Sequence, residues 1–436
     1  MPKAAFSTLG CKVNQYETEV MQRQFEADGF EVVPDREPAD VYVINSCTVT
    51  GEGDKKTKQL LRRLRRRSPG AVIALTGCFP QAFPEEAALI PEADVVTGAR
   101  ERAGVLDRVK QCLAARGHIV AVPPHEPGEP FEPMFADRFT EHTRAFVKIE
   151  DGCDRWCSYC IIPKARGPIR SKPLPELARE LAALAANGYR EAVLVGINLS
   201  SYGKESGALR LAEAVSLACA VPGIERVRLG SLEPELLTVE DVNVLAELEN
   251  FCPQFHLSLQ SGCAATLRRM NRHYDPIDYE RIVSLLRERF WDRPGGASIT
   301  TDIMVGFPGE DEDEFEESLA FVRRIGFARA HVFAYSPRAG TRAAEMENQV
   351  PPRVKEERSR RMLEAAAEAR RGFMETQRGT VQDVLFETRR ADGKYIGHTK
   401  NYTPVAAGSQ ADPRGKIVPV ELGGYDEKAD SCEGRI

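Results

Sequence analysis

Long hydrophobic runs are missing from this sequence. The longest uninterrupted apolar stretches are only a few residues, as in AVIAL at 71–75, whereas a helix needs about 20 to cross a bilayer. The first residues, MPKAAFSTLGCKVNQ, also lack the apolar core of a secretory signal. We therefore expect a cytoplasmic protein with no membrane contact.

An excess of positive charge is missing too. The 59 Lys and Arg residues are outnumbered by 65 Asp and Glu, which gives a net charge of −6. The chain therefore has no overall field that attracts nucleic acid, and any RNA contact must use a local basic patch. Hydrophobic residues make up 42% and charged residues 28% of the 436 positions, a composition typical of folded proteins with roughly two to four domains of this size.

Strand and helix patterns alternate over most of the chain, which favours an α/β fold. Residues 1–117 are predicted to form an N-terminal parallel α/β sheet domain, and the Pro-rich residues 118–140 an extended linker. Residues 141–375 contain six strand–helix repeats, too few for a closed eight-stranded barrel, so we expect a partial (βα)6 barrel. Residues 376–436 are typical of a small antiparallel β-barrel. Its tail, 426–436, is expected to be frayed because it has few apolar residues.

Eleven cysteines are present, and without an export signal they are expected to stay reduced and free for metals or catalysis. Three of them, Cys153, Cys157 and Cys160, share one loop after the first strand of the predicted barrel. Three thiolates can hold three irons of a cubane 4Fe–4S cluster and leave the fourth iron open. An open iron can chelate an amine and a carboxylate, and the methionine end of S-adenosylmethionine (SAM) has both. The alternatives are part of a zinc site, or three unrelated buried cysteines.

The CxxxCxxC spacing, with an aromatic residue before the last cysteine, resembles the signature of the radical-SAM superfamily. This resemblance implies that the three cysteines form the catalytic cluster site, where SAM is cleaved to a 5′-deoxyadenosyl radical. It also implies that Tyr159 packs near the SAM adenine, which suits the stacking preference of aromatic rings.

Cys11, Cys47 and Cys78 are far apart in sequence, but each follows a predicted strand. The carboxyl ends of parallel strands share one edge of a sheet, so these thiols could converge there. Three ordinary buried cysteines are the alternative. The segments TLGCKVNQYETE, INSCTVT and TGC, followed by the cysteine loop, resemble the radical-SAM methylthiotransferase family. That resemblance implies a second 4Fe–4S cluster on these three cysteines, used in sulfur delivery.

Other polar residues and glycines stand at strand ends of the predicted barrel. A buried polar group there needs a partner, which a cofactor such as SAM can provide, and a glycine lets backbone approach a ligand closely. For each position a simple turn is the alternative. The candidates for cofactor binding are Asn198, Ser231, Glu233, Gln260 and Gly306.

Two regions are candidates for RNA contact. Residues 55–67 (KKTKQLLRRLRRR) contain eight Lys or Arg and no acid on a predicted helix, which is either a solvated face or a phosphate-binding surface. The C-terminal module resembles a TRAM domain, a small RNA-binding barrel. Its charged and aromatic side chains could grip unpaired nucleotides, and they are Arg389, Arg390, Lys394, Lys400 and Tyr402.

Within the family, GCKVNQYETE resembles the bacterial subgroup that acts on N6-threonylcarbamoyladenosine at position 37 of tRNA. This implies methylthiolation of C2 of that base in the anticodon loop, in two SAM-dependent steps with two 4Fe–4S clusters. An electron donor such as flavodoxin or ferredoxin and a sulfur donor would be partners. The alternatives are a sister enzyme for isopentenyladenosine-37 or for a ribosomal-protein aspartate, and a non-catalytic metal-containing RNA-binding protein.

Overall fold

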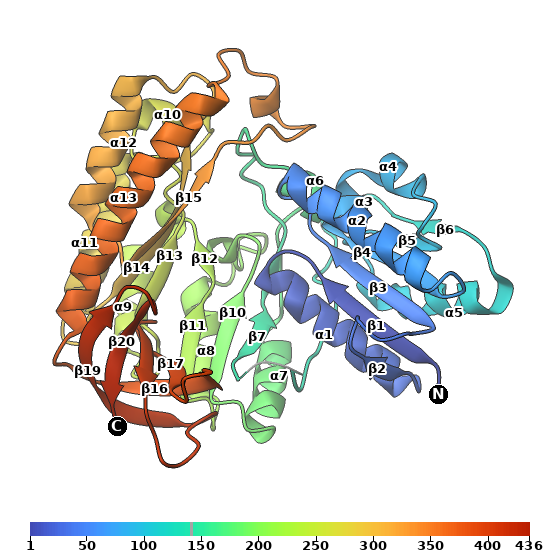
Figure 1. The fold of residues 1–436 in the computed structure, drawn as a ribbon, viewed down its shortest axis with the longest axis horizontal. Helices are drawn as coiled ribbons and strands as arrows, with labels where there is room; N and C mark the ends of the chain where they lie inside the picture. The colour runs from blue at the N-terminus through green and yellow to red at the C-terminus, as the bar shows by residue number, and fades with distance from the viewer. Residues whose placement is uncertain (140–142) are drawn as a thin grey trace.

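The computed structural model describes residues 1–139 and 143–436. It consists of an N-terminal sheet domain, a curved β/α unit and a small C-terminal barrel (Figure 1). The predicted boundary between linker and second domain, at residues 140 and 141, lies outside the described residues. Within the described part of the chain, no helix is both long and apolar enough to cross a membrane.

The N-terminal domain is built on a six-stranded parallel sheet. The sheet has the order β2-β1-β3-β4-β5-β6, with strands β1 (Lys3–Thr8), β2 (Glu31–Val33), β3 (Val41–Ser46), β4 (Val72–Gly77), β5 (Val95–Thr97) and β6 (Ile119–Ala121). Helices cover both faces, namely α1 (Lys12–Ala27), α2 (Gly51–Arg67), α3 (Cys78–Ala82), α4 (Pro84–Ala88) and α5 (Val105–Ala115). The sixth strand comes from the start of the Pro-rich segment.

The curved unit contains parallel strands in two adjoining sheets. Their orders are β11-β10-β7 and β12-β13-β14-β15. The bounds are β7 (Ala145–Lys148), β10 (Glu191–Val195), β11 (Arg226–Leu229), β12 (Ser231–Leu232), β13 (Gln254–Leu257), β14 (Ser298–Val305) and β15 (Arg329–Ala334). Only Gly230 separates β11 from β12, so these two segments form the third strand position of the predicted six. The α/β fold with a partial barrel is confirmed.

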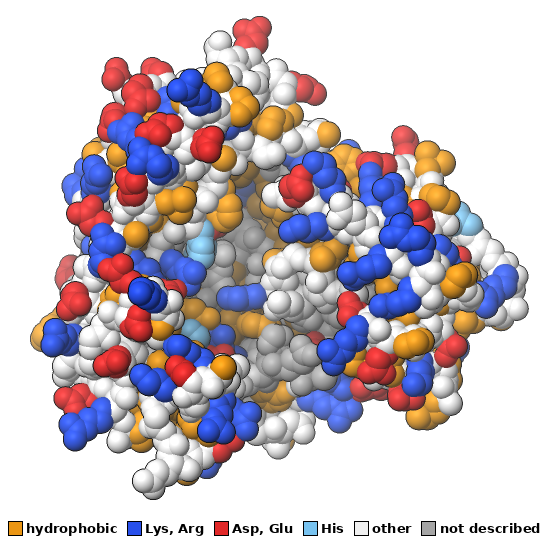
Figure 2. Space-filling model, viewed as in Figure 1, with side chains coloured by type: hydrophobic (Ala, Val, Ile, Leu, Met, Phe, Trp, Pro, Cys, Tyr) orange, Lys and Arg blue, Asp and Glu red, His pale blue; other side chains and the backbone are white. Residues whose placement is uncertain are grey.

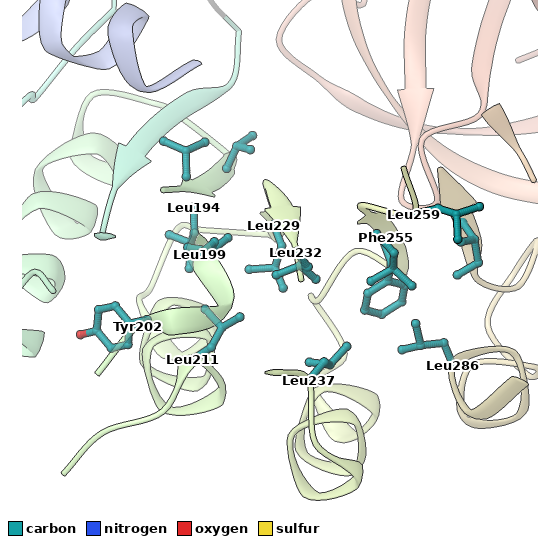
Figure 3. Packing of buried hydrophobic residues seen from close by; sticks show 14 of the residues in the cluster. Leu194, Leu199, Tyr202, Leu211, Leu229, Leu232, Leu237, Phe255, Leu259 and Leu286 are labelled. Atoms are coloured by element: carbon teal, nitrogen blue, oxygen red, sulfur yellow. The ribbon is translucent and has the colours of Figure 1, made fainter. Parts of the chain in front are cut away.

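Helices that follow these strands cover the outer face of the partial barrel (Figure 1). They are α7 (Leu174–Ala186), α8 (Leu211–Ala220), α9 (Val239–Glu247), α10 (Ala264–Arg269), α11 (Pro276–Arg289), α12 (Glu312–Ile325) and α13 (Pro352–Gln377). Buried leucines and aromatic residues from the strands pack against them, among them Leu194, Leu229 and Phe255 (Figure 3). The same core takes in Val13 and Tyr16 of α1, so α1 joins the two domains.

The C-terminal module is a closed five-stranded barrel, as predicted. Its order is β16-β17-β18-β20-β19, with β16 (Val381–Arg389), β17 (Tyr395–Thr399), β18 (Pro404–Ala407), β19 (Ile417–Asp426) and β20 (Ser431–Arg435). The expectation of a frayed tail is wrong. β20 closes the barrel by pairing antiparallel with β19 and parallel with β18, and Cys432 is fully buried.

Buried arginines hold this small barrel against the partial barrel. Arg226 donates to the carbonyl oxygens of Asp383 and His398, at 2.6 and 3.0 Å. Arg228 donates to the carbonyl of Lys400 at 2.9 Å. Both guanidinium groups lie beside the buried carboxylate of Glu191. These contacts fix the C-terminal barrel below the strands of the curved unit.

Candidate active site

The cysteine loop is pinned at both ends by a two-stranded antiparallel sheet, β8 (Glu150–Asp151) with β9 (Arg170–Ser171). Within it, the Cys153 amide donates to the Gly167 carbonyl at 3.0 Å. Gly152 has φ +90°, and a side chain there would overlap the Pro168 carbonyl. The loop then enters the short helix α6 (Ile162–Arg166). The local sequence therefore fixes the positions of the three thiols.

Each thiol of this triplet has an N–H donor directed at its sulfur. The donors are Asn198 Nδ2 to Cys153 at 3.8 Å, Arg272 Nη1 to Cys157 at 3.4 Å and the Ile162 amide to Cys160 at 3.4 Å. Burial raises the pKa of Cys160 to about 12, and the neighbouring Cys157 thiol adds to the rise. Burial likewise raises the pKa of Cys153. Burial thus disfavours the thiolate forms of Cys153 and Cys160, and metal binding favours them.

The second triplet lies at the carboxyl ends of three neighbouring strands. Strands β1, β3 and β4 are adjacent in the sheet. Cys47 and Cys78 directly follow β3 and β4, and Cys11 lies three residues after the end of β1. A Cβ on Gly10 would lie 2.7 Å from the Cys47 Cβ, so glycine is needed for the segments to approach. Burial raises the pKa of Cys78 to about 11, and the Cys11 and Cys47 thiols raise it further. The structure thus brings these three thiols to one edge.

Arg166, at the end of α6, reaches from the segment that follows the first triplet to the second triplet. Its side chain is fully buried. Nε donates to Cys78 Sγ at 3.1 Å, Nη2 to Asn14 Oδ1 at 2.5 Å and Nη1 to Glu17 Oε1 at 2.6 Å. Arg166 lies six residues after Cys160 in the sequence. It therefore touches the second triplet although it follows the first closely. Sequence reasoning missed Arg166, because its role depends on contacts across the two domains.

The donor chemistry fits iron–sulfur clusters better than a single ion. Among the described residues, no three His, Cys, Asp or Glu side chains lie close enough to share one metal ion. Thiolates on different irons of a cubane cluster lie farther apart than the ligands of one ion, and N–H groups aimed at sulfur are typical of such clusters. In the first triplet each sulfur has such a donor, and in the second Arg166 Nε donates to Cys78.

Two predicted cofactor residues adjoin the cysteine loop. Asn198 is buried, and its Oδ1 has no hydrogen-bond partner within the described chain. The backbone N–H of Asn198 donates to Glu150 Oε2 at 2.7 Å. Glu233 accepts from Arg272, the same arginine that contacts Cys157, and burial raises the pKa of its carboxyl group. An orphaned buried acceptor beside the cysteines is suited to a polar ligand such as the SAM amine.

The other predicted residues are spread around the same strand ends. Tyr159 packs edge-on against Phe307, with 6.3 Å between ring centroids. Gly306 has φ +70°, and the aliphatic part of Lys355 covers its open face. Gln260 has φ +66° and joins β14 through backbone hydrogen bonds. Ser231 is exposed and lines a large cavity inside the partial barrel.

Of the candidate RNA-binding residues, three on α2 are exposed and make no ion pair with any described residue. They are Lys56, Arg63 and Arg66, which share one face of the helix by their spacing. In the C-terminal barrel, Tyr402 stacks on His398 at 4.3 Å and lies against Arg144 and Arg228. Its ring is therefore already held by protein groups.

Two family models match the chain. Residues 3–98 match Uncharacterized protein family UPF0004, and residues 147–322 match the Radical SAM superfamily. The chain is 40% identical over 403 residues to the threonylcarbamoyladenosine tRNA methylthiotransferase MtaB of Thermotoga maritima, covering 92% of this chain and 90% of the relative. The MtaB of Bacillus subtilis is 37% identical, with 97% and 94% covered. This chain belongs to the radical-SAM tRNA methylthiotransferase family.

Family membership makes the protein an enzyme, with SAM and 4Fe–4S as its cofactors. A second kind of relative is the tRNA-2-methylthio-N(6)-dimethylallyladenosine synthase of Caldicellulosiruptor saccharolyticus, 35% identical over 87% of this chain and 81% of its own length. Among solved structures, TsrM from Kitasatospora setae, a radical S-adenosylmethionine methyltransferase, aligns with TM-score 0.57 and 16% identity, covering 79% of this chain and 77% of that one. At that identity the likeness concerns the fold alone.

Proposed function

We propose that the protein attaches a methylthio group to C2 of N6-threonylcarbamoyladenosine at position 37 of tRNA. The observation that carries the proposal is the similarity, over most of the chain and at up to 40% identity, to MtaB relatives that are named for this substrate. The two cysteine triplets, with Arg166 reaching from the segment after the first to Cys78 of the second, support it. Methylthiolation of isopentenyladenosine-37 is the second candidate, because dimethylallyladenosine synthases match at 35%.

In this proposal each cysteine triplet holds one 4Fe–4S cluster. Cys153, Cys157 and Cys160 would hold the first, and Cys11, Cys47 and Cys78 the second. When bound, the clusters and two molecules of SAM supply the radical, the sulfur and the methyl group that replace the hydrogen on C2. The chain itself directs N–H donors at these thiols. Asn198 Oδ1, which has no hydrogen-bond partner among the described residues, can accept from the SAM amine.

Partners follow from the same chemistry. The anticodon loop must present the base, splayed from its stack. An electron donor such as flavodoxin or ferredoxin would reduce the first site, and a sulfur donor would restore the sulfur that each turnover consumes. We place this reaction in the cytoplasm, where tRNA is modified. The domains are proposed to divide the work as sulfur delivery (1–117), SAM cleavage (141–375) and RNA binding (376–436).

Complementation of a deletion strain tests the function. Wild-type protein should restore methylthio-threonylcarbamoyladenosine in whole-cell tRNA, measured by mass spectrometry of nucleosides. Cys153→Ala and Cys47→Ala should not. Purified anaerobically, Cys153→Ala should form no 5′-deoxyadenosine from SAM, whereas Cys47→Ala should retain cleavage and bind about four irons instead of about eight.

Cys219→Ala is the control, because Cys219 lies outside both triplets on helix α8, and it should restore the nucleoside fully. Loss of a methylthio-isopentenyladenosine peak in the deletion strain would favour the second candidate. Full product from Cys47→Ala would contradict the second cluster.

A further inference from the structure

A cavity of about 740 Å³ lies inside the partial barrel, between its inner face, the start of α1, α13 and the C-terminal barrel. Its size is within the range of small-molecule sites, about 300–1,000 Å³. Cys11 of the second triplet lines it from the N-terminal domain. Figure 2 looks into this hollow, where His and Lys or Arg side chains are visible on the wall. The cavity can hold a nucleotide base together with a substituent.

The wall carries more positive than negative charge. Its cations are Lys12, Arg228, Arg329 and Arg370, and its acids are Asp302 and Asp430. Arg228 is neutralised by Glu191 at 2.8 Å, and Arg370 by Asp430 at 2.6 Å. Arg329 is left with a distant contact of 3.8 Å to the same Asp430. A cationic wall in a protein with net charge −6 favours an anionic ligand.

Strand β15 presents this wall to the cavity. Alternate residues Arg329, His331 and Phe333 share one face of the strand and all line the cavity. The Arg329 side chain is 51% exposed and Phe333 is 54% exposed. Among the residues that the structure describes, His331 has no hydrogen-bond partner, and its ring lies 6.2 Å from that of His256. Hydrogen-bonding groups and an apolar ring are thus available to one ligand.

The strand order places β15 and the second triplet at different edges of the partial barrel. β15 is one edge of the partial barrel, and β7, against which α1 packs, is the other. In adenine, N1 lies between C2 and C6. The exocyclic bonds at C2 and C6 therefore diverge, and with C2 turned toward the Cys11 side a group on N6 is directed to another part of the wall. Strand β15 lines the same cavity and can receive that group.

We propose that Arg329 and His331 bind the carboxylate of the threonyl group on N6 of the substrate base, and that Phe333 packs against its aliphatic part. This inference rests on the proposed function and adds the residues that select the substituent. A hydrogen-bonded charge pair in a partly closed site is worth about tenfold or more in affinity. A tRNA backbone phosphate is another anion with the same binding chemistry, and the probes below separate the two.

The experiment measures binding of three anticodon stem-loops to anaerobically reconstituted full-length protein. The first carries threonylcarbamoyladenosine at position 37, the second carries the same base with its carboxylate as a primary amide, and the third carries adenosine. Wild-type protein should prefer the acid to the amide by about tenfold or more. Arg329→Gln should abolish that preference while leaving affinity for the adenosine stem-loop unchanged, and His331→Gln should reduce it.

Arg323→Gln is the matched control, because Arg323 is 56% exposed on the outer helix α12, and it should behave as wild type. Equal weakening of all three stem-loops by Arg329→Gln would identify a phosphate contact and overturn the proposal, as would an unchanged acid preference in both cavity variants. If wild-type protein neither prefers nor methylthiolates the threonylcarbamoyl base, the proposed function itself fails. If it methylthiolates that base while the variants keep the preference, only this inference fails.

Discussion

The buried carboxylate of Glu17, together with that of Asp151, balances the cations where the two larger domains meet. Its oxygens lie 3.0 Å from Arg102, 2.8 Å from Lys148 and 2.6 Å from Arg166. Burial alone would raise the pKa of Glu17, but these three cations hold it well below its usual range. The same residue therefore fixes Arg166, which contacts Cys78.

We expect Glu17→Gln to lower the free energy of unfolding by about 3–5 kcal/mol. Among the described acids, it leaves Arg102 with only a 3.8 Å contact to Glu132, and Lys148 and Arg166 with Asp151 alone. Since the folded-state pKa is depressed, the contribution of Glu17 is complete above about 4.5 and is lost as the pH falls below that value. The difference between wild type and variant should shrink accordingly in urea titrations at descending pH. Glu26→Gln, which removes only partly exposed ion pairs, should cost less than about 1 kcal/mol. Equal losses for both variants would contradict this account.

The cysteines and Arg166 show what sequence reveals at this scale. The spacing of Cys153, Cys157 and Cys160 is local, so its chemistry can be inferred from the sequence alone. Cys11, Cys47 and Cys78 required a fold prediction, namely that parallel strands end at one edge. Nothing in the sequence indicated the role of Arg166, because a charged residue after the loop is expected to be solvated. Its partners, Glu17 and Asn14, lie across the domain boundary and are known only from the structure.

At the scale of elements, local patterns predicted most helices and strands, and contacts distant in sequence explain the exceptions. Helix α12, Glu312–Ile325, is of the first kind, because its apolar periodicity is local. Strand β20 (SCEGR) has no such pattern. It exists because β18 and β19 offer unpaired backbone groups on both sides, and closing a barrel leaves no free edge.

Gly434 of β20 gives a test of this closure. A Cβ at Gly434 would lie 2.6 Å from Val405 Cγ1 and 2.8 Å from Val420 Cγ1, whereas one at Gly408 would meet nothing within 4 Å. Gly434→Ala should therefore destabilise the barrel by about 1–3 kcal/mol through overpacking. Gly408→Ala should be neutral or stabilise it by up to about 1 kcal/mol. Hydrogen exchange should accelerate in β18 and β20 for the first variant only, and unchanged protection there would refute the barrel packing.

At the scale of the whole molecule, the proposed function requires a large polyanion to bind a protein whose net charge is −6. Helix α2 begins four residues after Cys47, so its basic face belongs to the domain that carries the second triplet. Figure 2 shows Lys and Arg side chains over this domain, on the side from which the hollow is open. We therefore expect α2 to guide the tRNA while the cavity receives the base.

The decisive residues on α2 are Lys56, Arg63 and Arg66, because no described acid neutralises them. Replacing all three with Gln should weaken tRNA binding. It should also reduce the slope of log affinity against log salt by about 0.7–0.9 for each phosphate contact that is lost. SAM cleavage in the absence of tRNA should not change, because the cysteine loop lies in the other domain. The readout is the dissociation constant at several salt concentrations.

A control with the same change in net charge separates local contact from the overall field. Arg281→Gln, Arg289→Gln and Arg323→Gln remove three exposed charges from α11 and α12, which lie across the molecule from α2 (Figure 1). If binding depends on a docking surface, only the α2 variant loses affinity and salt slope. If both variants lose them equally, long-range attraction is responsible, and the tRNA does not contact α2.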